Sequence, residues 1–180
     1  MISKSRMLTS FAASERGLTA FALVSVAAPS AALALFIGKF GVNVIFSDEW
    51  EMVPLYQSMV RSKLSLAELF AQHNEHRIFF PRLLMLLLER LSSFNVIAEM
   101  YFSWLLVTAT VGLVFLIYLR DSGVWNLKVI TYFWPISLLM LSFRQEEAVL
   151  WGFECQIYLT VFCVVASVFL LDGAARRTRF

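Results

Sequence analysis

Two short polar clusters in this chain hold most of the residue types that catalysis uses. The first is Ser47-Asp48-Glu49-Trp50-Glu51, and the second is Gln72-His73-Asn74-Glu75-His76-Arg77, which contains both histidines of the chain. Carboxylates and imidazoles move protons in enzymes and ligate metals. These two clusters are therefore the first candidates for an active site.

Asp48 and Glu49 of the first cluster are candidate catalytic residues. They directly follow an apolar segment that is long enough to cross a membrane. A carboxyl group beside lipid has its pKa raised towards the value that a general base needs at neutral pH. The alternative is an interfacial belt, in which Trp50 anchors the helix while the acids stay in water.

The second cluster suits either a metal or a phosphate. His73 and His76 are three positions apart, so on a helix they share a face, with Glu75 nearby. Two imidazoles and a carboxylate are typical ligands of a divalent metal such as zinc or manganese. Two alternatives stay open: His76 and Arg77 bind substrate or phosphate, or the segment is a solvated loop.

A third polar cluster begins at Arg144 and continues through Glu146 and Glu147 to Glu154. Arg144 is a candidate for binding an anionic head group. The alternative is again a polar belt at the membrane surface.

Composition indicates what kind of protein must position these clusters. The chain has 180 residues, of which 59% are hydrophobic and only 16% charged, and its mean hydropathy is +0.73. A soluble domain of this size cannot bury so much apolar surface. The composition therefore excludes a cytosolic enzyme, a disordered chain and a disulfide scaffold. The net charge of +2 does not favour a nucleic-acid partner.

We predict an all-α, polytopic membrane protein with four transmembrane helices in a single membrane domain. Each predicted span is a run of mostly apolar residues near the length that a bilayer requires. The predicted spans cover residues 17–38, 99–119, 125–143 and 154–171. They leave outer loops at about 47–97 and 144–153. A cleaved signal peptide is the alternative interpretation of the first span.

Residues 78–94 form a fifth apolar run that is interrupted by charges. Arg82, Glu89 and Ser93 fall on one stripe of a helix, and leucines cover much of the rest. This pattern predicts an amphipathic helix lying in the membrane interface. A fifth span is the alternative. The long loop also predicts shorter amphipathic helices, one of them capped by Ser65 with Glu68 three residues later.

Charge distribution predicts the orientation, because cytoplasmic ends of membrane proteins are rich in lysine and arginine. With four spans, both termini are cytoplasmic and most acids lie outside. A fifth span would place the basic C-terminal tail outside, against this rule. We expect an integral protein of a bacterial inner membrane. The residues predicted on the cytoplasmic side include Lys4, Arg6, Arg16, Arg120, Lys128, Arg176, Arg177 and Arg179.

The order of these features resembles the N-terminal part of the GT-C superfamily of integral membrane glycosyltransferases. A span ends in Asp48-Glu49, surface helices follow, and a histidine-containing stretch leads through residues 76–81 into an apolar helix. The matching stretch is roughly residues 46–120. Residues 72–84 and 143–157 also resemble a family of uncharacterised bacterial polytopic membrane proteins of that type.

The resemblance implies a transferase that takes a hexosyl or pentosyl group from a polyprenyl-phosphate donor in the lipid phase. It assigns acceptor activation or metal binding to Asp48 or Glu49, near His73 or His76. It also implies that Arg77, Arg82 or Arg144 neutralises the leaving phosphate, as a departing phosphate requires fixed positive charge. Such enzymes usually have more spans. One alternative is therefore that this chain is a truncated form that is inactive alone. The alternative is a non-enzymatic accessory subunit or scaffold whose partners are membrane lipids.

Overall fold

The computed structural model describes the backbone of residues 4–177 and the side chains of residues 17–177. The predicted cytoplasmic side chains of Lys4, Arg6 and Arg16, and the whole of Arg179, lie outside this part. All regular elements of the described residues are helices, which confirms the all-α class. They are α1 (Lys4–Phe40), η1 (Ser47–Glu51), α2 (Met52–Val60), α3 (Leu66–Leu69), α4 (Phe79–Ser92), α5 (Val96–Ser122), α6 (Leu127–Met140), η2 (Phe143–Gln145), α7 (Glu146–Val149), η3 (Gly152–Glu154) and α8 (Cys155–Arg177).

Three helical segments are long and apolar enough to cross a membrane. They are Gly17–Phe40 within α1, Val96–Ser122 and Gly152–Arg177. Each matches one predicted span and extends it by a few residues, which is consistent with an integral membrane protein of helical type. The remaining predicted span, 125–143, corresponds to α6, which has only 14 residues. That helix begins at the Asn126 cap and ends shortly after Pro135, so it is shorter than expected.

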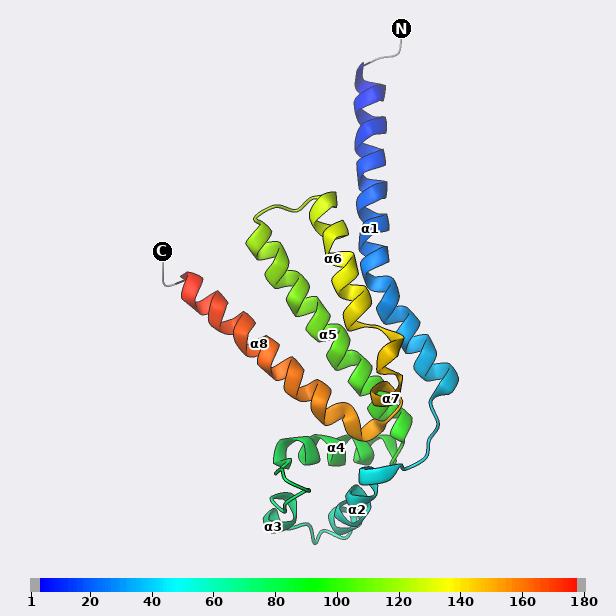
Figure 1. Cartoon of the computed structure of the whole chain (residues 1–180), viewed down its shortest axis with the longest axis vertical. Helices are drawn as coiled ribbons and strands as arrows, with labels where there is room; N and C mark the ends of the chain where they lie inside the picture. The colour runs from blue at the N-terminus through cyan, green and yellow to red at the C-terminus, as the bar shows by residue number, and fades with distance from the viewer. Residues whose placement is uncertain (1–3, 178–180) are drawn as a thin grey trace.

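The long helices lie side by side, and the polar loops gather at one end of them (Figure 1). Along the chain, α1 runs towards this end, α5 runs away from it, α6 returns, and α8 runs away again. We call it the loop end, and it consists of η1 to α4 together with η2 to η3. The opposite end, where α5 and α8 finish and α6 begins, is the basic end, with Arg120, Lys128 and Arg176.

Polar side chains fasten the long helices to one another. The Ser30 and Thr108 hydroxyls are 2.7 Å apart and join α1 to α5, and the Trp104 indole N–H donates to the Ser30 carbonyl at 2.9 Å. On the other side of α1, the Ser137 hydroxyl of α6 donates to the Val26 carbonyl at 2.6 Å. In lipid there is little hydrophobic drive between helices, so such bonds help to fix their register.

At the loop end, short helices fold beneath the long ones around a second apolar core. Its fully buried members are Met52, Leu55, Leu69, Met85, Leu86, Phe153 and Cys155. The predicted capping box is confirmed: the Glu68 backbone N–H donates to the Ser65 hydroxyl, and the Ser65 N–H donates to the Glu68 carboxylate. This cap begins α3 and thereby places the polar segment that follows.

The predicted amphipathic helix exists as α4, and it crosses the foot of α5 and α8 (Figure 1). An interfacial helix was expected to turn its charged stripe to water. Instead Arg82 and Glu89 are buried at 3% and 0% exposure, while Leu87 and Leu91 are exposed. The charged stripe faces inward because α2, α3 and α5 pack against α4. Arg82 finds backbone carbonyl acceptors there, whereas the Glu89 carboxyl has no hydrogen-bond partner among the described residues. The leucine face is left for the membrane interface.

Candidate functional site

The predicted acid and histidine clusters meet at the loop end. The His73 Nδ1 atom lies 2.6 Å from a Glu51 carboxylate oxygen, and its Nε2 atom lies 3.6 Å from Asp48 Oδ2. The two acids are three positions apart in the 3-10 turn η1, where residues i and i+3 share a face. This turn therefore directs Asp48 and Glu51 to the same side, where His73 lies between them.

A tight turn fixes the position of His73. The backbone groups of His73 and His76 exchange two hydrogen bonds of 2.8 Å, and Asn74 between them adopts φ +48°. Asparagine is among the residues that tolerate this left-handed conformation. The His73 ring packs against Phe153 with ring centroids 5.2 Å apart, and only 6% of the side chain is exposed. The imidazole is thus held on a rigid support.

The contacts of His73 define which of its nitrogens is available. An ionised Glu51 carboxylate only accepts hydrogen bonds, so Nδ1 carries the proton and donates to it. In the neutral ring, Nε2 is then a basic nitrogen directed at Asp48. The Asp48 side chain is 41% exposed, so it has access to molecules outside the chain. Together these groups can take up a proton at Asp48 and share it with the imidazole.

Arg82 lies next to Glu51 and has a structural role. Its guanidinium donates to the backbone carbonyl of Leu69 at 3.2 Å and to that of Ala71, and it lies 4.0 Å from Glu51. These carbonyls end α3 and have no helical partner of their own. Arg82 therefore ties α4 to the end of α3 and supports Glu51.

The other predicted site residues do not join Asp48. Glu75, His76, Arg77 and Arg144 are all exposed. Within the described residues, none of their side chains forms a hydrogen bond or an ion pair with Asp48 or with each other. His76 and Arg77 directly follow the turn that holds His73, whereas Arg144 belongs to η2 in the other loop.

The predicted metal set of His73, Glu75 and His76 does not form a ligand group. In the part of the chain that the structure describes, no three or more histidine, cysteine, aspartate or glutamate side chains are arranged to hold a metal ion. His73 points to Glu51 and Asp48, while Glu75 and His76 are exposed. The tight turn separates these side chains instead of placing them on one helical face.

Behind Asp48 lies a cluster of three buried carboxyl groups, from Glu49, Glu89 and Glu99. All three side chains have at most 2% exposure. The Glu49 and Glu99 carboxyls both border Gly152. Both Glu89 oxygens and one oxygen each of Glu49 and Glu99 have no hydrogen-bond partner in the described structure. We call these three residues the carboxyl cluster.

Burial raises the pKa of two of these acids, Glu89 and Glu49. Loss of hydration raises the pKa of Glu89 to about 8, and the nearby Glu49 charge adds to this rise. Burial likewise raises the pKa of Glu49, against a hydrogen bond from the Phe46 N–H. Glu49 is thus a buried acid that faces Glu99, and Asp48 alone of the two predicted catalytic acids is accessible.

Gly152, which begins η3 in the second loop, packs directly against the carboxyl cluster. A Cβ atom at this position would lie 2.6 Å from Glu99 Oε2 and 2.9 Å from Glu49 Oε1. No side chain fits there without displacing a carboxyl group. The η3 turn can therefore contact η1 and α5 closely, and this packing also positions Phe153 against His73.

Sequence reasoning missed Glu89 and Glu99 as members of a site. Glu89 was placed on the water-facing stripe of an amphipathic helix, and Glu99 among the outer acids. The usable signal was position: each acid stands within or at the end of a strongly apolar helix, where an unpaired charge is costly.

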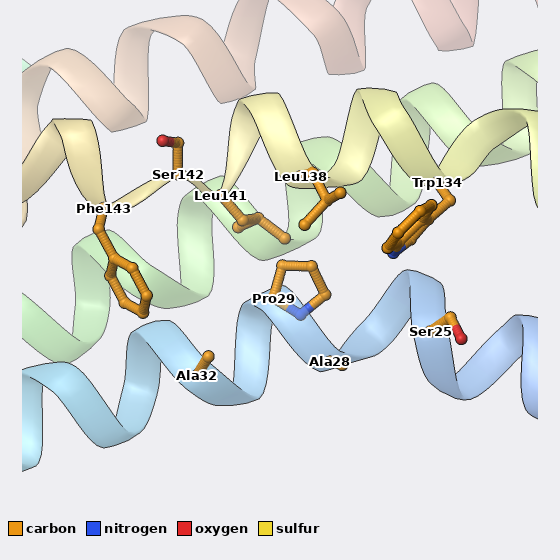
Figure 2. A pocket seen from close by; sticks show the side chains of 9 residues that line it. All are labelled: Ser25, Ala28, Pro29, Ala32, Trp134, Leu138, Leu141, Ser142 and Phe143. Carbon is orange, nitrogen blue, oxygen red and sulfur yellow. The ribbon is translucent and has the colours of Figure 1, made fainter.

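A large cavity of the molecule lies far from this chemistry. It has a volume of about 460 Å³ and lies between α1 and α6, with Pro29 and Trp134 among its lining residues (Figure 2). The lining has no ionisable side chain. Its walls are mostly apolar and offer no group for proton transfer, so it is not a candidate reaction site.

Neither family models, nor curated proteins, nor solved structures gave a match to this chain. We call the Asp48–His73–Glu51 arrangement the acid–histidine site. The proposed function therefore rests on the geometry of this site.

Proposed function

We propose that this chain is a GT-C-like membrane glycosyltransferase that resembles the N-terminal part of that superfamily, and that Asp48 is its acceptor-activating base. The observation that supports this proposal is the 3.6 Å approach of Asp48 to His73 Nε2. The pair lies at the foot of the spanning helices, where a lipid-linked donor and a water-soluble acceptor can meet. Asp48 is preferred over Glu49 because Glu49 is fully buried.

The proposed reaction is a displacement at the anomeric carbon of a polyprenyl-phosphate sugar. The acceptor hydroxyl oxygen forms the new bond to that carbon while Asp48 takes the hydroxyl proton. The bond between the anomeric carbon and the phosphate oxygen breaks, and its electron pair leaves with the lipid phosphate. His73 shares the proton through Nε2, and Glu51 stabilises the resulting imidazolium, as carboxylates do for catalytic histidines.

A departing phosphate also requires positive charge. We propose His76 and Arg77 as its contacts, because they follow the same turn as His73 and are exposed. Arg144 is a further proposed contact from the second loop. Arg82 is unsuited to this task, because its guanidinium is engaged with the Leu69 and Ala71 carbonyls.

We further propose that the chain crosses the membrane four times. In Figure 1, α5 and α8 run in the same direction, so the segment between them must return through the layer. That segment contains α6, whose 14 residues rise about 21 Å, and the flanking residues complete the crossing. The basic end then faces the cytoplasm with both termini, and the loop end faces outward across a bacterial inner membrane.

A transfer assay tests the proposed function. Membranes that contain the full chain are given a radiolabelled polyprenyl-phosphate sugar, and label in a glycosylated acceptor is measured for the wild type and for Asp48→Asn. We expect transfer by the wild type and its loss in the variant. The matched control is Glu147→Gln, which removes an exposed acid from the same end of the molecule and should leave transfer unchanged. Equal transfer by wild type and Asp48→Asn contradicts the proposal.

One observation favours a second candidate, a non-enzymatic accessory subunit or scaffold. The exposed arginines Arg77 and Arg144 make no contact with Asp48, so the described residues do not converge on a complete phosphate site. If the chain is such a subunit or scaffold, the wild type gives no transfer with any donor. Asp48→Asn then changes neither folding nor assembly.

A further inference from the structure

The basic end of the molecule has a cavity that the proposed transfer reaction does not use. The cavity has a volume of about 410 Å³ and lies beside the last turn of α8, with Arg120 of α5 in its wall. Its other lining residues include Phe169, Gly173, Arg176 and Arg177. Both helices are span candidates, so their last turns lie at the membrane surface in either orientation of the chain.

The arginines of this cavity differ in what they contact. Arg176 bridges the two helices, because its guanidinium lies 2.6 Å from Asp121 and 2.8 Å from Asp172. Both nearby carboxylates are thus engaged by one arginine. Arg120 stacks on the Phe169 ring, with the guanidinium carbon 4.0 Å from the ring centroid. Within the described residues, neither Arg120 nor Arg177 has a carboxylate partner.

The usual role of basic residues in a last turn is to offset the helix dipole. That role does not require a cavity between two helices, nor an arginine stacked across it on the neighbouring helix. The Arg120 guanidinium lies over the Phe169 ring, and no acceptor within the described residues engages its N–H groups, so they are able to donate to a ligand. A planar guanidinium matches the oxygen geometry of a phosphate group.

We propose that this cavity binds the phosphate of an anionic phospholipid in the adjacent leaflet, with Arg120 and Arg177 as its contacts. Phe169 and Leu170 supply apolar walls, which suit the glycerol and acyl parts of a lipid rather than a free phosphate ion. Basic pockets between spanning helices are a recognised way of holding anionic head groups. We call this cavity the lipid-phosphate site.

The test uses the full chain in nanodiscs made from equal amounts of phosphatidylglycerol and phosphatidylcholine. After gentle extraction, native mass spectrometry counts the lipids that stay bound. We expect phosphatidylglycerol to be retained preferentially, by roughly fivefold for each arginine that contacts it. The double variant Arg120→Gln/Arg177→Gln should lose this preference. Equal retention of the two lipids by the wild type overturns the proposal.

Two further variants separate a built site from general charge attraction. The control Arg61→Gln/Lys63→Gln removes the same charge from exposed positions at the loop end and should keep the preference. Gly173→Leu changes no charge but fills the cavity beside Arg120, since a Cβ there lies 3.7 Å from Arg120 Nη1. It should lower retention as the double arginine variant does. Unchanged retention in Gly173→Leu, or equal loss in the control, overturns the site.

Added inorganic phosphate tests whether the site binds the phosphate of a lipid or a free phosphate ion. For a lipid site, added phosphate should leave phosphatidylglycerol bound, because the acyl contacts persist. Displacement of the lipid by phosphate alone overturns the assignment to a phospholipid. Circular dichroism of every variant shows whether the helices have folded. If the double arginine variant loses its helical signal, Gly173→Leu decides the matter.

Discussion

The Asp48 carboxylate lies 3.6 Å from the Nε2 atom of His73, a residue 25 positions further along the chain. Glu51 holds the opposite nitrogen of the same ring at 2.6 Å. A carboxylate on each side of one imidazole fixes the ring orientation, and it leaves one basic nitrogen beside Asp48, which is itself accessible. This relationship is the basis of the proposed proton transfer.

His73→Gln tests the histidine half of this site. Glutamine has no basic nitrogen, so the variant loses the group that shares the proton of Asp48. We expect transfer to fall about 100-fold or more, as for the loss of a general acid–base partner. Transfer should be followed in the same membranes as for Asp48→Asn. Wild-type transfer by His73→Gln would show that the imidazole has no part in the reaction.

Arg82→Met tests the structural role assigned to Arg82. Methionine leaves the Leu69 and Ala71 carbonyls without their buried donor, and it leaves Glu51 without its cation. We expect a loss of about 2–4 kcal/mol in the free energy of unfolding. The measurement is urea or thermal unfolding in detergent, followed by tryptophan fluorescence.

Arg90→Met is the matched control for Arg82. It removes an exposed arginine from the same helix and should change the unfolding free energy by less than about 0.5 kcal/mol. Equal effects of the two substitutions would contradict the buried contacts of Arg82.

Gly152→Ala tests how tightly the second loop packs on the carboxyl cluster. The new Cβ would lie 2.6 Å and 2.9 Å from the Glu99 and Glu49 oxygens, so a carboxyl group must move. We expect a destabilisation of about 1–3 kcal/mol, measured as a lowered midpoint of thermal unfolding. Gly112→Ala is the control, because nothing lies within 4 Å of its Cβ and alanine favours a helix.

A rescue variant makes this prediction more specific. Glu99→Asp shortens the side chain that the new Cβ at position 152 would meet, so it should restore part of the stability lost in Gly152→Ala. Additive destabilisation by the two substitutions would mean that they do not share this contact.

Glu89→Gln tests the pH dependence that the carboxyl cluster predicts. The pKa of Glu89 is about 8 in the folded protein, against an ordinary value of 4.5. Between these values the folded state keeps a proton that the unfolded state releases, so stability falls as pH rises from about 4.5 to about 8 and then levels off. Glutamine stays neutral at every pH, so the stability of the variant does not show this decrease.

The stability difference between Glu89→Gln and wild type should therefore grow with pH and reach on the order of 4 kcal/mol near pH 8. Thermal unfolding at a series of pH values measures it. Glu146→Gln, at an exposed position, should show no such trend. A difference between Glu89→Gln and wild type that is constant across pH would rule out a proton held at Glu89.

Features that depend on local sequence were predictable. Apolar length defines a span, so three predicted spans match helices that are long and apolar enough to cross a membrane. The Ser65–Glu68 capping box needs only four residues and is present. The length of α6 was overestimated, because its cap at Asn126 and the irregular chain after Met140 depend on packing at each end.

The burial of a helix face depends on which other segments pack against it, and this could not be predicted from the sequence. The charged stripe of α4 was expected in water, since nothing in its own sequence reveals that α2, α3 and α5 enclose it. Glu99 joins Glu49 and Glu89 only because a corner at Ser93 and Phe94, with both residues at positive φ, turns α4 into α5. Pattern alone did not reveal that tertiary packing buries these acids at the loop end.

In the proposed four-span topology, the acid–histidine site faces the compartment opposite to the basic end. Single cysteines can test it in intact cells, in a Cys163→Ser background in which Cys155 is buried. A membrane-impermeant maleimide should label Glu75→Cys, beside His73, in intact bacteria. It should label Val124→Cys, in the exposed loop between α5 and α6, only after permeabilisation. Labelling of position 75 only after permeabilisation would contradict the account.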